Sequence, residues 1–80
     1  MELVELTEYL VKEILPDVDG VVVKKVEDSD CNIIEILVPS EYISKVIGKG
    51  GNIANAIRTI VQASAYIKKL GKVRINIDTL

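Results

Sequence analysis

Apolar and polar positions follow a different period in successive parts of this 80-residue chain. Leucine and isoleucine at 3, 6, 10 and 14 have helical spacing, so they predict an amphipathic helix over 3–15, which Pro16 ends. The short β-branched runs 21–26 and 33–38 predict two strands. The polar residues between these strands predict a turn and therefore a hairpin.

The second half of the chain predicts two helices and a last strand. A short helical pattern over 40–47 ends at a group of glycines, and a longer one over 52–70 is closed by Gly71. Valine and isoleucine then alternate with polar residues over 73–78, as in a strand with one buried face. The order α-β-β-α-α-β predicts an α+β fold, in which helices pack on a three-stranded sheet, as one small domain over 1–80.

Three glycines, Gly48, Gly50 and Gly51, occupy four positions between the two predicted helices. Glycine loses more backbone freedom on folding than any other residue, so three together indicate positive φ angles or close approach of a ligand. The loop leads into a helix N-terminus, whose unpaired N–H groups favour an anion, and Lys49 adds a cation. This chemistry predicts a phosphate-binding loop; a plain glycine-rich turn is the alternative.

Neither of two familiar phosphate-binding motifs fits this loop. A Walker A loop and a dinucleotide-binding loop both follow a strand with other glycine spacings, whereas a helix precedes the loop here. The segment instead resembles the KH (K-homology) nucleic-acid-binding domain, with strands on both sides of the sequence Val46-Ile47-Gly48-Lys49-Gly50-Gly51-Asn52-Ile53 and with Ile57 beyond it. The element order resembles a type II KH domain over essentially the whole chain. The chain is similar to the bacterial KH-domain protein A family of small RNA-binding proteins.

The resemblance implies that the chain binds single-stranded RNA without catalysis. In KH domains the Gly-x-x-Gly loop clamps the backbone of about four nucleotides. Ile36 and Val38 are candidates for the floor of an apolar groove, or else for the core. The residues expected to bind RNA by this resemblance are Gly48, Lys49, Gly50, Gly51, Ile47, Ile53, Lys45 and Arg58. Asn52 and Asn55 stand where many relatives carry bases, which weakens the expected electrostatic attraction.

The family resemblance also implies a cellular role. Members of the bacterial KH-domain protein A family are described as RNA chaperones that act with a larger Jag-type KH protein in cell-wall and cell-length control. No apolar run approaches the roughly 20 residues of a membrane span, and the acidic N-terminus is unlike a signal peptide. Cytoplasmic location is therefore expected.

Enzymatic chemistry has little support in the composition. The chain has no histidine and one cysteine, Cys31, so it lacks the residues for a zinc site, a Ser-His-Asp triad or a Cys-His pair. Asp28 and Asp30 could form a carboxylate pair, but a hairpin turn explains them without chemistry. We expect no enzyme activity, metal, cofactor or small-molecule substrate.

Charge is distributed unevenly along the chain, although the net charge is only −2. Residues 1–39 carry ten acidic and three basic side chains, for a local charge of −7. Residues 40–80 carry seven basic and two acidic side chains, for +5, and include the glycine loop. This asymmetry predicts an acidic face and a basic face.

The helix predicted over 52–70 has an unusually wide apolar surface. At roughly 100° per residue, its apolar residues span about 220°, compared with a stripe of roughly 100° on a surface helix. Either the sheet and the first helix cover both flanks, or one flank binds a second copy or a larger KH protein, and a charge at Val61 would then separate the pair. The alternative function is accordingly a KH-fold dimerisation or protein-interaction module with little RNA binding.

Overall fold

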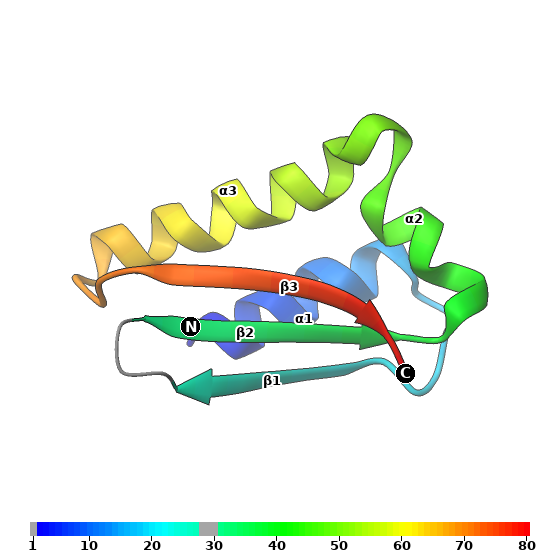
Figure 1. The fold of residues 1–80 in the computed structure, drawn as a ribbon, viewed down its shortest axis with the longest axis horizontal. Helices are drawn as coiled ribbons and strands as arrows, with labels where there is room; N and C mark the ends of the chain where they lie inside the picture. The colour runs from blue at the N-terminus through cyan, green and yellow to red at the C-terminus, as the bar shows by residue number, and fades with distance from the viewer. Residues whose placement is uncertain (1, 28–30) are drawn as a thin grey trace.

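The computed structural model describes residues 2–27 and 31–80 (Figure 1). The expected Asp28–Asp30 turn and the carboxylate pair considered there lie outside the described residues. The predicted order α-β-β-α-α-β, with a three-stranded sheet and packed helices, is confirmed. Short 3₁₀ turns at Ser40–Tyr42 and Lys49–Gly51 supplement the main elements, which are α1 (Leu3–Ile14), β1 (Val22–Glu27), β2 (Asn32–Val38), α2 (Ile43–Ile47), α3 (Asn52–Ile67) and β3 (Val73–Thr79).

The sheet has the order β1-β2-β3 and mixes two kinds of pairing. β1 and β2 form the predicted antiparallel hairpin, with Val23 opposite Ile36. β2 and β3 are parallel, with Ile36 opposite Ile77. Parallel neighbours require a crossover, and here α2 and α3 supply it. The crossover leaves β3 at the edge of the sheet, alongside α3 (Figure 1).

The core lies between the helices and one face of the sheet. Alternate β2 residues, Ile34, Ile36 and Val38, are at most 1% exposed. Thr7 of α1 is also buried, and its hydroxyl donates to the Leu3 carbonyl at 2.7 Å, so its polar group is satisfied. The remaining buried apolar residues of the core cluster are Leu3, Val11, Leu15, Val46, Ile57, Val61, Ala65, Val73 and Ile75.

The wide apolar surface of α3 is covered on one flank only. Val61 is fully buried, so the prediction that it lies on a flank open to a partner is wrong. Ile60 and Ile67, by contrast, are 45% and 78% exposed. The flank left open by the fold is therefore the one that carries these two isoleucines.

The C-terminus of α3 is closed earlier than predicted, and Gly71 is not its cap. The Leu70 N–H donates to the Ala65 carbonyl at 3.0 Å and the Lys69 N–H to the Tyr66 carbonyl at 3.1 Å. These two bonds form a Schellman motif, which places Lys69 in the left-handed position that glycine usually occupies. Its φ is 58°, and Lys69 is the one non-glycine residue with positive φ in the described chain.

Candidate nucleic-acid interface

Gly48 joins α2 to the glycine loop in a conformation that requires glycine. Its φ of 77° and ψ of 175° lie in a region that side-chain-bearing residues rarely adopt. A Cβ on Gly48 would lie 2.5 Å from Asn52 Oδ1 and 2.6 Å from Ile53 Cγ1, closer than van der Waals contact allows. Gly48 is therefore needed for the close approach of α2 to the first turn of α3.

The tip of the loop, Lys49 and Gly50, is open to solvent, and Gly51 is half-buried. Gly50 and Gly51 have φ angles of 64° and 79°, and a Cβ on Gly50 would meet no atom within 4 Å. Lys49, between Gly48 and Gly50, is exposed. The N-cap of α3 is Gly51, and no side chain caps the helix. The Asn52 N–H, the first of α3, donates to the Lys49 carbonyl within the turn. The positive end of the helix dipole lies beside this loop and favours an anion there.

A groove begins beside this loop and runs between α3 and β3. Its volume is about 610 Å³. We call it the α3–β3 groove. Its lining residues are Ile47, Gly51, Ala54, Asn55 and Arg58 on the helical side and Glu35, Ile75, Asn76, Ile77 and Asp78 on the strand side.

Arg58 is held in the α3–β3 groove by its neighbour on the helix. Its Nη1 donates to Asn55 Oδ1 at 2.7 Å. The two side chains are three residues apart, so they share one face of α3. Asn55 therefore orients the one cation that lines the groove, a function that its place after the glycine loop does not indicate.

Three of the sequence-predicted residues, Ile47, Gly51 and Arg58, meet in the α3–β3 groove. Gly48, Lys49 and Gly50 form the adjoining loop. Ile53 lies elsewhere, because it packs against the core and directly behind Gly48. Lys45 extends over the Tyr42 ring, with its Nζ 5.8 Å from the ring centroid.

The structure decides between the two placements predicted for Ile36 and Val38, and it confirms the core. Ile36 and Val38 are 0% exposed, so they belong to the core and cannot form a groove floor. β3 takes that place with Ile75 to Asp78, and β2 contributes Glu35. The alternation of residues 73–78 predicts a strand, but nothing in it shows that this strand lies beside α3. That position follows from the parallel crossover.

Comparison with known proteins agrees with this geometry. The family model for the KH domain of KhpA and KhpB matches residues 4–77. This chain belongs to the KhpA/KhpB KH-domain family. A protein named RNA-binding protein KhpA from Clostridium perfringens is 42% identical over 73 residues, which are 91% of this chain and 96% of the relative.

Other relatives with the same name are similarly close. The protein from Caldanaerobacter subterraneus is 42% identical over 65 residues, 81% of this chain and 87% of its own length. The protein from Aquifex aeolicus is 39% identical over 68 residues, 85% of this chain and 84% of its own length. No solved structure matches the chain significantly.

Two further features bear on the function. Over the described ranges 2–27 and 31–80, no helix combines the length and apolar character needed to cross a bilayer. Within the same ranges, no three His, Cys, Asp or Glu side chains gather into a possible metal site.

Gly48 and Gly50 provide a matched test of the loop. Gly48→Ala should lower the free energy of unfolding by about 3 kcal/mol or more, because a left-handed, β-like backbone and two close contacts act together. Gly50→Ala should cost only about 1 kcal/mol, because its space is open and its backbone is simply left-handed. Urea denaturation measures both values. Equal losses for the two variants would show that the contacts behind Gly48 do not constrain the loop.

Proposed function

We propose that this chain binds single-stranded RNA without catalysis, with the glycine loop on the phosphates and the α3–β3 groove on the bases. The observation that carries the proposal is the α3 N-terminus, which has no side-chain cap and adjoins the groove through a loop that requires glycine at Gly48. Membership in a family whose relatives are named RNA-binding proteins supports it.

The phosphates contact the helical side of the site. Gly48, Gly50 and Gly51 let the backbone come close to the phosphates, Lys49 supplies an ammonium group, and Lys45 adds long-range attraction. The N–H groups of Gly48 and Gly51 stay bonded within the protein, to the Ser44 and Gly48 carbonyls. Arg58, oriented by Asn55, neutralises a further phosphate at the edge of the groove. About four nucleotides fill such a site.

The bases point toward β3. Glu35 and Asp78 on that side repel phosphate but accept hydrogen bonds from the amino groups of bases. The neutral amide of Asn76 can both donate hydrogen bonds to bases and accept them. Ile47 and Ile77 supply apolar surface for the base faces. Ile53 supports the loop from behind instead of contacting RNA, since it packs against the Gly48 backbone.

The family role extends this proposal to partners. We propose an RNA chaperone in the cytoplasm that pairs with itself or with a larger Jag-type KH protein, and through it affects cell-wall and cell-length control. The open flank of α3 supports such pairing, because Ile60 and Ile67 are exposed beside the face of the helix that packs in the core. If RNA binding proves negligible, the same flank favours the alternative, a KH-fold dimerisation module.

The loop is tested by reversing its charge. Lys49→Asp with Gly50→Asp should weaken RNA binding at least tenfold, because two carboxylates then face the phosphates. The matched control is Lys49→Asn with Gly50→Asn, which has nearly the same shape, tolerates positive φ and adds no negative charge. RNA titration of both variants, with circular dichroism to check folding, isolates the effect of charge. A folded double-aspartate variant that binds RNA like the wild type would exclude the loop as the phosphate site.

The open flank of α3 is tested by placing a charge on it. Ile60→Glu should dissociate a pair at least tenfold more readily while the fold survives, because a carboxylate would be buried at the contact. Thr59→Glu is the control, since it adds the same charge one position away on the polar face of α3. Sedimentation at micromolar concentrations measures both. A wild type that is monomeric under these conditions, alone and when mixed with a Jag-type KH protein, contradicts the proposal.

A further inference from the structure

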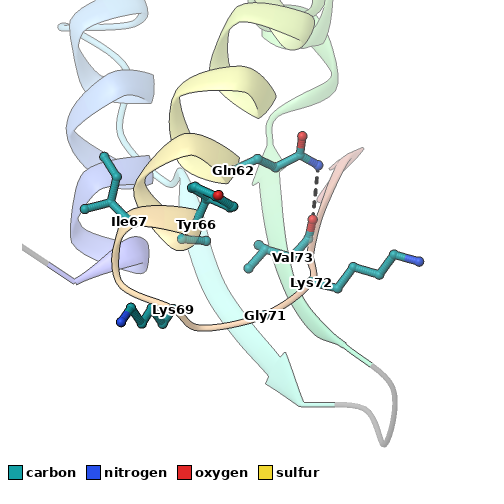
Figure 2. Close-up of a pocket in the computed structure, with 8 residues that line it drawn as sticks. Gln62, Tyr66, Ile67, Lys69, Gly71, Lys72 and Val73 are labelled. Carbon is teal, nitrogen blue, oxygen red and sulfur yellow. Dashed lines mark hydrogen bonds between the residues drawn. The ribbon is translucent and has the colours of Figure 1, made fainter.

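A second hollow lies at the other end of α3 from the glycine loop (Figure 2). Its volume is about 810 Å³. We call it the terminal pocket. Gln62 fixes its inner wall, because its Nε2 donates to the Val73 carbonyl at 3.1 Å and so ties α3 to β3. The lining residues are Gln62, Ala65, Tyr66, Ile67, Lys69, Gly71, Lys72 and Val73.

An exposed aromatic ring is the main feature of the terminal pocket. Tyr66 is 84% exposed, more than Tyr9 at 54% and far more than the half-buried Tyr42. A ring so exposed contributes little to the stability of the fold. Aromatic faces at the surface are the usual platforms on which single-stranded nucleic acids stack their bases.

The charges around this ring have one sign. Lys69 and Lys72 line the terminal pocket and are exposed, and no acidic residue lines it. In Figure 2 their ammonium groups extend on opposite sides of Tyr66. Lys69 also keeps its left-handed backbone at a cost that glycine would avoid. The strained position thus carries a cation where glycine would be more stable.

The terminal pocket continues the α3–β3 groove along the same side of α3. Asn55 and Arg58 line the groove, and Gln62 and Tyr66 line the pocket. Their spacing of three, four and four residues places all four on one face of the helix. At 1.5 Å per residue, Tyr66 lies about 16 Å along the axis from Asn55. An RNA that fills the groove can therefore reach the pocket only if it extends beyond the groove.

We propose that the terminal pocket is a second subsite for the same RNA strand. Tyr66 stacks on a base beyond the nucleotides in the groove, and Lys69 and Lys72 neutralise the adjoining phosphates. A ligand that combines a flat apolar face with negative charge fits one tyrosine between two lysines. This inference rests on the proposed RNA binding and extends it to longer strands.

The test compares a four-nucleotide and an eight-nucleotide oligoadenylate. The ratio of the octamer's affinity to the tetramer's affinity is measured for the wild type and for Tyr66→Ala. The octamer has more binding registers than the tetramer, but this advantage is the same for both proteins and cancels when their ratios are compared. The variant should lower the ratio about fivefold or more, the lower end of what a stacked base contributes. Tyr9→Ala, on the acidic helix α1, is the matched control and should leave the ratio unchanged.

Removing bases instead of the side chain separates stacking from charge. Two octamers that carry four abasic positions, at the 5′ or at the 3′ end, keep every phosphate but leave the pocket without a base when the groove is filled. On these RNAs Tyr66→Ala and the wild type should bind alike. Lys69→Gln with Lys72→Gln should reduce the salt dependence of octamer binding and leave that of the tetramer as it is.

The outcomes distinguish the two proposals. A wild type that binds neither RNA overturns the proposed function, and the second subsite with it. A wild type that binds both RNAs, with a ratio that Tyr66→Ala does not change, overturns the second subsite alone. A Tyr66→Ala variant that dissociates a dimer in sedimentation but keeps the affinity ratio assigns the terminal pocket to a protein contact instead.

Discussion

The close approach of Gly48 to the first turn of α3 is the constraint on which the rest of the site depends. A side chain there would overlap Asn52 and Ile53, so α2 and α3 can meet at this angle only through glycine. The end of α3 beside this loop has no side-chain cap, and the side of the helix packs against β3. The loop and the groove therefore both depend on the backbone at Gly48, since Ile47 and Gly51 on either side of it line the groove.

Electrostatics in this site are local. The chain is acidic overall, with a net charge of −2, yet the loop, Arg58 and the two lysines of the terminal pocket follow one seam between α3 and β3. Interactions beyond about 10 Å are largely screened at 0.1 M salt, so the acidic α1 opposes RNA binding only weakly. Glu35 and Asp78 are the exception, because they line the groove, and in the proposed binding mode their charge would repel phosphates toward the helical side.

The order of elements and the glycine loop could be predicted from the sequence, because periodicity and glycine spacing are local properties. The strand that lies beside α3 could not be predicted in the same way, because it depends on how the sheet is assembled. β3 pairs in parallel with β2 at the sheet edge, so Ile77 and Asp78 line the groove. Ile36 and Val38 lie in the core, which was one of the two placements predicted for them. The open flank of α3 was likewise unpredictable, since an apolar arc does not show which edge the sheet covers: Val61 is buried and Ile60 is not.

The salt dependence of RNA affinity tests the central claim most directly, because it counts the phosphates that the protein neutralises. For single-stranded RNA, log K should fall with log salt concentration by about 0.7 per phosphate. In the proposed binding mode, Lys49, Arg58 and the α3 N-terminus contact roughly two or three of the three phosphates that join four nucleotides, so we expect a slope of about −1.4 to −2.1. A slope near zero would contradict a phosphate-binding loop and would mean that apolar contacts alone hold the RNA.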